Sequence, residues 1–187
     1  MPDSVTVLQG QFEALRAEIA ARSAAQAGAI QLAVTAVGAL GGLAFATGGD
    51  RRLLLLIPIV ATFLGLIWLD HAANIFNLGD FIKDRIMPRL KEEAGMDDLP
   101  DYETFVRGYE RNRLAVIRAF TLPPFLIFVL IPAAAMAVSF EAAHKSWGYW
   151  MLFGLDGLLL TIFLLYWLPF ARGPRPERRG IPPSAAA

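Results

Sequence analysis

LLLLIPIVATFLGLIWL, residues 53–69, is the stretch that decides the fold. It carries no charged residue, and Leu and Ile dominate it. An α-helix rises about 1.5 Å per residue, and the hydrocarbon core of a bilayer is about 30 Å thick. The stretch therefore predicts a helix that crosses a membrane, with Ala72 and Ala73 adding length if the helix tilts.

Three further stretches are similarly apolar. They are residues 26–47 (QAGAIQLAVTAVGALGGLAFAT), 119–140 (AFTLPPFLIFVLIPAAAMAVSF) and 148–170 (GYWMLFGLDGLLLTIFLLYWLPF). Short connections join the first stretch to the second and the third to the fourth, so each pair is expected to form an antiparallel hairpin. The predicted fold class is all-α, an integral membrane four-helix bundle of two hairpins with a cytoplasmic helical layer.

The composition of the chain also indicates a membrane protein. The chain has 187 residues, of which 56% are hydrophobic, and a net charge of zero. Nearly all charges lie between the apolar stretches, and the absence of Cys excludes disulfides and thiol chemistry. The N-terminal residues lack a basic segment followed directly by an apolar core, so the first apolar stretch is expected to be an uncleaved anchor.

The positions of Lys and Arg predict the orientation, since cytoplasmic flanks carry the excess of both. With the N-terminus inside, only Arg51, Arg52 and Lys145 lie outside. The inner flanks then hold the remaining basic residues, which include Arg16, Arg22, Lys83, Arg85, Arg89, Lys91, Arg107, Arg111, Arg113, Arg118, Arg172, Arg175, Arg178 and Arg179. Both termini are therefore expected in the cytoplasm. The preference for Arg and Ala favours a bacterial cytoplasmic membrane.

The segments between the apolar stretches give the expected organisation. Residues 1–25 form a cytoplasmic N-terminal helix, 26–69 the first transmembrane hairpin, 70–118 a cytoplasmic helical hairpin, 119–170 the second transmembrane hairpin and 171–187 a disordered cytoplasmic tail. The N-terminal helix shows an apolar stripe, and the second span is expected to continue as a helix until Pro88. The stripe consists of Val7, Phe12, Leu15 and Ile19.

The segment that follows Pro88 is expected to contain a second helix, which Asp98 or Asp101 caps. Phe105, Tyr109 and Leu114 are expected on the apolar side of this helix. Aromatic residues at the ends of the spans favour the membrane–water interface. They are Trp68, Trp147, Tyr149, Trp150, Tyr166 and Trp167.

The runs WLDHAANIFNLGDFIKDRIMPRL and LPDYETFVRGYERNR, followed by a span that contains Pro, carry a resemblance. From about Leu15 to Phe170, the chain resembles a group of bacterial four-span integral membrane proteins to which no activity is assigned. The resemblance implies the same four-span layout.

Asp156 is the most unusual residue of the spans, because a carboxyl group within the hydrocarbon region costs about 2.5 to 3.5 kcal/mol on insertion scales. It is expected to face protein or water, or to stay protonated. Helical counting places it about 12 Å below the outer face, level with Gly38, Thr62 and the step from Ile131 to Pro132. The expected hydrogen-bond partners are the Thr62 hydroxyl, a carbonyl freed by Pro132, or a second copy of the chain.

One face of the first span combines polar and small residues. Gln31 and Thr35 lie on the same face as Gly38, Gly42 and Ala46, and the two glycines form a GxxxG pattern. Small residues allow close approach of two helices in lipid. The face is expected to pack either against another span of the same chain or against a second copy.

A second polar group lies where the second span meets the cytoplasm. Asp70, Asn74 and Asn77 share one helix face, and His71 is adjacent to it. One His with two amides is a poor metal site, and no Ser or Cys pairs evidently with His71. The cluster is interpreted as a structural polar network, with a ligand-binding or pH-sensitive site as the main alternative.

No catalytic, metal or cofactor motif is found in the sequence. The expected function is non-enzymatic: a multi-pass, oligomeric membrane protein in sensing, assembly or membrane-directed effector work. The alternatives are a small ion or proton-linked channel or transporter that uses Asp156, and an inner-interface enzyme that uses Asp70 and His71. The expected partners are the bilayer, anionic lipid head groups at the Arg-rich flanks and a second copy, but not nucleic acid.

Overall fold

The computed structural model describes residues 4–95, 122–143 and 147–171. Within these ranges the chain is helical and contains no strand. The elements are α1 (Ser4–Phe45), the 3-10 helix η1 (Arg51–Leu55), α2 (Leu56–Phe81), the π-helix η2 (Ile82–Ile86), α3 (Met87–Ala94), the π-helix η4 (Leu126–Leu130), α6 (Ile131–Ala143) and α7 (Trp147–Ala171). Four helical stretches are long and apolar enough to cross a membrane, which confirms the expectation from the four apolar stretches. The expected helix with Phe105, Tyr109 and Leu114 lies outside the described residues, and so does nearly all of the expected tail.

Helix α1 is one continuous helix that includes both the expected N-terminal helix and the first span. On its N-terminal half, Leu8 is buried and Phe12, Leu15 and Ile19 are half-buried. Their spacing of three and four residues is that of a helix seam. Val7 was expected on this stripe, but it is 46% exposed because Leu8 takes the buried position in that spacing.

A tight turn joins α1 to η1. Gly48 has a φ of +78°, which favours glycine. At Gly49, a Cβ would meet the carbonyl oxygens of Leu43, Ala44 and Ala46, so only glycine fits. Asp50 then caps η1, because its Oδ1 accepts a hydrogen bond of 2.9 Å from the backbone N–H of Arg52.

The helix that starts at α2 does not end at Pro88 as expected. The π-helix η2 precedes Pro88, and the chain continues as α3 to Ala94 before Gly95 ends it with a φ of +62°. The same arrangement occurs at η4, which precedes Pro132. Proline lacks the N–H donor and crowds the carbonyl four residues earlier, and a wider π turn at that place relieves the contact. Both prolines are therefore accommodated within helices.

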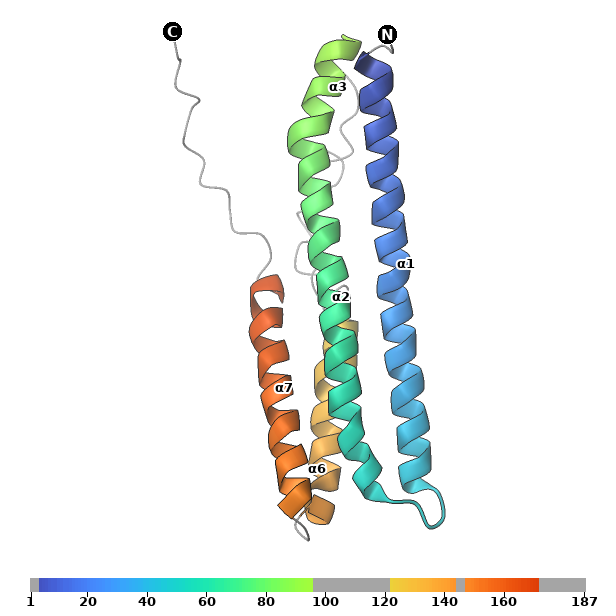
Figure 1. Ribbon diagram of the computed structural model, residues 1–187, viewed down its shortest axis with the longest axis vertical. Helices are drawn as coiled ribbons and strands as arrows, with labels where there is room; N and C mark the ends of the chain where they lie inside the picture. Colours follow the sequence, from blue (N-terminus) through green and yellow to red (C-terminus); the bar gives the residue numbers. More distant parts are fainter. Residues whose placement is uncertain (1–3, 96–121, 144–146, 172–187) are drawn as a thin grey trace.

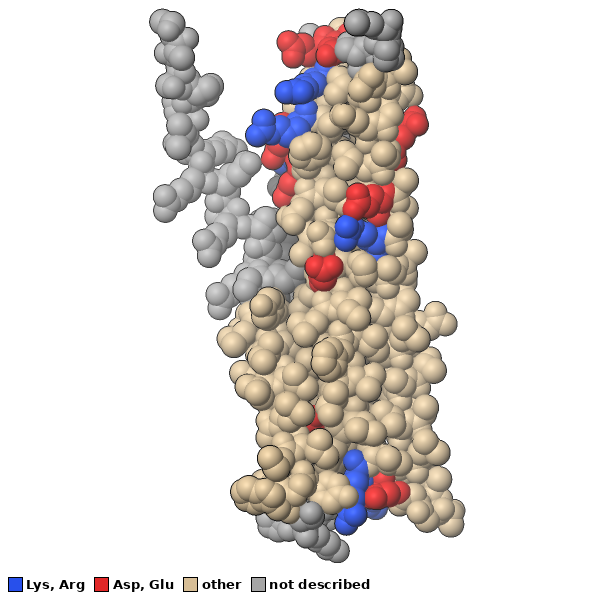
Figure 2. All heavy atoms as spheres, in the orientation of Figure 1, with Lys and Arg blue, Asp and Glu red and all other residues tan. Residues whose placement is uncertain are grey.

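Two helical stretches are much longer than a membrane is thick. Helix α1 has 42 residues, and the stretch from Arg51 to Glu93 has 43. At about 1.5 Å per residue each is over 60 Å long, about twice the hydrocarbon core. In Figure 1, α1 runs beside α2 and α3 over its whole length, and this pair extends well beyond the ends of α6 and α7. Figure 2 shows charged side chains over the extended half and at the opposite end, with an almost entirely uncharged band between them.

Helix α2 contacts α1, α6 and α7, and aromatic rings fill the space among these helices. Trp68 packs against Trp167 with ring centroids 5.7 Å apart, and Phe128 packs against Phe163 at 6.0 Å. Trp68 and Trp167, two of the aromatic residues at the predicted span ends, are 6% and 4% exposed because they form this cluster.

Candidate functional site

Asp156 lies in α7 and is fully buried. Its neighbours Leu155 and Leu158 are 43% and 57% exposed, so α7 turns its carboxyl-bearing face toward the other helices and an apolar face outward. Neither carboxylate oxygen has a hydrogen-bond partner in the part of the chain that the structure describes. Asp156 therefore faces the other helices, and with Thr62 and Ser139 it is one of the fully buried polar side chains among the described residues.

Packing contacts give the register of the helices around Asp156. A Cβ built at Gly65 of α2 would lie 2.6 Å from Phe163 Cε2, and Trp68 packs on Trp167. Helices α2 and α7 thus run in the same direction, and counting back from these pairs puts Pro58 level with Asp156. Thr62 lies about one turn, or about 6 Å, further toward the aromatic cluster.

On α6, Met136 is the residue that lies level with Asp156. Its Cε lies 4.0 Å from a Cβ built at Gly157. Helical counting in the sequence had instead placed Thr62 and the step from Ile131 to Pro132 level with Asp156. Counting assumed equal depths for all spans, whereas side-chain packing sets the actual offsets between helices.

Two hydroxyl groups are buried near this level on the neighbouring helices. Thr62 of α2 is 0% exposed and its Oγ1 has no hydrogen-bond partner among the described residues. The expected hydrogen bond between Thr62 and Asp156 is therefore not formed. Ser139 of α6 is also 0% exposed, and its hydroxyl donates to the carbonyl oxygen of Ala135. Sequence reasoning missed Ser139, although a hydroxyl inside the run AMAVSF was a signal that could have indicated it.

The surroundings of Asp156 differ between the two directions along the bundle. Toward the end of α7, the cluster of Trp68, Phe128, Phe163 and Trp167 fills the interior. Toward the start of α7, Tyr149 lies two turns before Asp156 on the same helix face, and the Arg52 guanidinium sits 4.5 Å from the centre of its ring. Arg52 Nε also lies 3.8 Å from Asp50 Oδ1. At the end of the bundle that carries η1, Arg52 and Asp50 thus lie beside Tyr149, on the face of α7 that also bears Asp156.

The structure brings together part of the predicted cluster around Asp70. Asn74 Nδ2 donates a hydrogen bond of 2.9 Å to the backbone carbonyl of Asp70, while the Asp70 carboxylate and Asn77 are exposed. His71 is half-buried, and its Nδ1 is buried without a hydrogen-bond partner in the described ranges.

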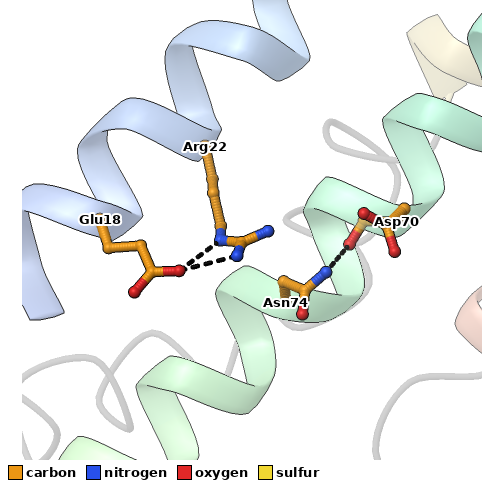
Figure 3. Close-up of polar contacts among 4 residues, drawn as sticks. All are labelled: Glu18, Arg22, Asp70 and Asn74. Carbon is orange, nitrogen blue, oxygen red and sulfur yellow. Dashed lines mark hydrogen bonds and ion pairs between the residues drawn. The ribbon is translucent and has the colours of Figure 1, made fainter.

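An ion pair on α1 was not anticipated. Arg22 donates to Glu18 Oε1 at 2.7 Å, and Figure 3 shows this pair together with Asp70 and Asn74 on the facing stretches of α1 and α2. The spacing of Glu18 and Arg22, four residues apart on a helix, was the signal in the sequence.

The face with the GxxxG pattern points away from the rest of the described chain. Gln31, Thr35, Gly38, Gly42 and Ala46 are all exposed, and nothing lies within 4 Å of a Cβ built at either glycine. The Thr35 hydroxyl donates to the carbonyl oxygen of Gln31, within α1 itself.

Three other small residues of α1 face inward, namely Ala29, Ala33 and Ala44. Of the two expected uses of the glycine face, packing against another span is therefore not found in the described residues.

Comparisons with known proteins identify no relative. No protein-family model, curated protein or solved structure matches the chain. Among the described residues, no group of three or more His, Asp or Glu side chains could hold a metal ion.

Proposed function

We propose that this chain is a non-enzymatic integral membrane protein of the bacterial cytoplasmic membrane that holds a long helical hairpin in the cytoplasm for assembly or sensing. The observation that carries the proposal is the length of α1 and of the stretch from Arg51 to Glu93, 42 and 43 residues. About half of each helix is enough to cross the hydrocarbon core. The other half of each remains outside it.

Packing supports a rigid connection between the two halves of this hairpin. The seam of α1 runs from Leu8 and Phe12 in the extended half to Ala29 and Ala33 in the apolar half, at spacings of three and four residues. A continuous seam lets α1 and α2 act as one stiff unit. A displacement of the cytoplasmic tip is then transmitted to the spans, as both sensing and assembly require.

The proposed orientation places the extended half and both termini in the cytoplasm, because the excess of Lys and Arg follows that half. Basic residues such as Arg85 and Arg89 would then also attract anionic lipid head groups. In this arrangement the four spans form the bundle of two hairpins, with α2 in contact with α1, α6 and α7.

Oligomerisation is the remaining part of the proposal, and the exposed glycine face of α1 supports it. In lipid, close approach of two backbones supplies the packing that the hydrophobic effect does not. A second copy of α1 fits a face on which a Cβ at Gly38 or Gly42 would meet nothing of the same chain.

The orientation can be tested directly, because the native chain has no Cys and single cysteines need no background correction. Ala20→Cys lies in the extended half of α1, and Arg51→Cys lies at the start of η1, at the opposite end. In intact spheroplasts, a membrane-impermeant maleimide should label Arg51→Cys at once and Ala20→Cys only after lysis. Labelling of Ala20→Cys in intact spheroplasts would refute the cytoplasmic hairpin.

Oligomerisation needs a separate experiment. Thr35→Cys, on the exposed face, should form disulfide-linked dimers in oxidised membranes. Ala33→Cys, which faces α2, is the matched control on the same helix and should not. If Thr35→Cys forms no more dimer than Ala33→Cys, the glycine face is not an interface between copies.

A further inference from the structure

The fully buried carboxyl group of Asp156 has no evident role in a scaffold. A membrane helix gains nothing in stability from a carboxyl group that lacks a partner, since its burial alone costs about 2.5 to 3.5 kcal/mol. Both of its oxygens are without a hydrogen-bond partner in the described chain. Binding of a ligand or a proton would stabilise this carboxyl group, and a purely structural role does not explain why it is there.

No positive charge compensates Asp156 from the elements packed against α7, which are α2, α6 and η1. The described side chains of α6 carry no charge, and the first titratable groups of α2 are Asp70 and His71, about 18 Å along the helix from Pro58. In η1, Arg52 is held over Tyr149 and near Asp50, and Arg51 is exposed.

An ionised carboxylate in these surroundings would be both desolvated and unpaired. Binding a proton removes the charge and supplies an O–H donor.

We propose that Asp156 is an exchangeable proton-binding site inside the spans, open to the end of the bundle that carries η1. The proposal goes beyond a scaffold role. In the exchange step the carboxyl O–H bond breaks, the electron pair stays on the carboxylate oxygen, and the proton passes to water on that side. No other reactant is needed.

The asymmetry of the surroundings assigns the open side. Asp156 lies about 14 Å along α7 from Trp147 and about 22 Å from Ala171. The shorter side holds the apolar contact of Leu54 and Ile57 with Ala44 and Ala135, and the rings of Phe140, Trp150 and Phe153. Phe140 and Trp150 are 44% and 40% exposed, so these rings are not close-packed, and the hydroxyl groups of Ser139 and Tyr149 lie on the same side. Ser139 lies on this side because the adjacent Phe140 packs against Trp150 and Phe153, which precede Asp156 in α7.

The longer side is closed by packed rings. The Thr62 hydroxyl lies about one turn from Asp156 on this side. Beyond it, Trp68, Phe128, Phe163 and Trp167 are each 6% exposed or less and offer no carboxyl or hydroxyl group. Hydroxyl groups can relay a proton, whereas a close-packed aromatic cluster excludes the water that a relay needs.

Labelling with an apolar carbodiimide tests the proposal, because the reagent partitions into the bilayer and reacts with protonated carboxyl groups there. The full-length chain in proteoliposomes should gain one adduct that mass spectrometry maps to Asp156. The adduct should fall at least about tenfold as the medium changes from mildly acidic to mildly alkaline, and should return on reacidification. A water-soluble carbodiimide, which labels surface groups such as Glu13, gives the comparison reaction.

Variants test whether Asp156 carries the adduct, and buffers applied to one side of the membrane test from which side its proton exchanges. Asp156→Asn retains the shape of the side chain and should lose the adduct, whereas Asp156→Glu should retain it. Alkaline buffer on the side where Arg51→Cys is reactive should suppress labelling, and alkaline buffer on the other side alone should not.

Three results would overturn the proposal. They are no adduct at any pH, an adduct of constant yield at every pH, and protection by Na⁺ that does not depend on pH. Constant yield would mean that Asp156 holds its proton permanently and serves packing alone. The wild-type chain is enough for all three, so misfolding of a variant does not affect the decision.

Discussion

Gly65 is the place where the packing of the spans can be tested most directly by a single methyl group. A Cβ at this position would lie 2.6 Å from Phe163 Cε2, 3.1 Å from Phe163 Cζ and 3.1 Å from Phe128 Cγ. Both rings are 0% exposed and lie in the aromatic cluster, so neither can turn away without displacing Trp68 or Trp167. Gly65→Ala should therefore destabilise the protein.

The size of the effect follows from two opposing contributions. Replacing Gly by Ala inside a helix stabilises it by up to about 1 kcal/mol, and overpacking a filled core costs about 1 to 3 kcal/mol. Gly154→Ala is the matched control, because it lies in a span and nothing is within 4 Å of its Cβ. The difference between the two variants isolates the contact with the rings, and it should be about 1 to 3 kcal/mol.

Unfolding by denaturing detergent, followed by tryptophan fluorescence, is a suitable assay because Trp68 and Trp167 are in the cluster that the methyl group disturbs. Gly65→Ala should unfold at a lower detergent fraction than wild type, and Gly154→Ala at the same or a higher one. Equal shifts for the two variants would show that α2 does not approach Phe163 closely. The register of Asp156 relative to Pro58 and Thr62, which rests on this contact, would then be wrong.

Three other sites can be tested with the same unfolding assay. Thr62→Val removes a buried hydroxyl that has no partner, so the protein should be unchanged or more stable by up to about 2 kcal/mol, and a loss above about 1 kcal/mol would indicate a partner for Oγ1. Arg52→Ala removes the cation from the Tyr149 ring and should cost about 0.5 to 1 kcal/mol, a loss that should persist in high salt if the ring rather than an ion pair is responsible. Ala33→Leu should cost about 1 to 3 kcal/mol by overpacking the contact with α2, whereas Leu32→Ala, at a position 61% exposed, should change the stability far less in detergent.

The number of spans and the buried state of Asp156 could be predicted from the sequence, because both depend on single-helix properties. Length and apolarity define a span, and an acidic side chain inside one must turn toward protein or water. The depth of Thr62 relative to Asp156 could not be predicted, since it depends on how Gly65 lets Phe163 approach α2. The continuation through Pro88 was missed for a similar reason, because the π turn that accommodates a proline has no signature in hydropathy.

For α1, by contrast, the sequence contains enough information to predict which face of the helix packs against α2. Small residues recur every few positions on both sides of its apolar half, so GxxxG by itself does not say which side meets α2. The amphipathic half of the same helix does carry that information, because Leu8, Phe12, Leu15 and Ile19 define one seam. Continued at spacings of three and four residues, that seam reaches Ala29 and Ala33 and leaves the glycines on another face. Where a charged helical half continues without a break into an apolar half, the spacing of apolar residues in the charged half therefore predicts which face of the apolar half is buried, which hydropathy alone does not.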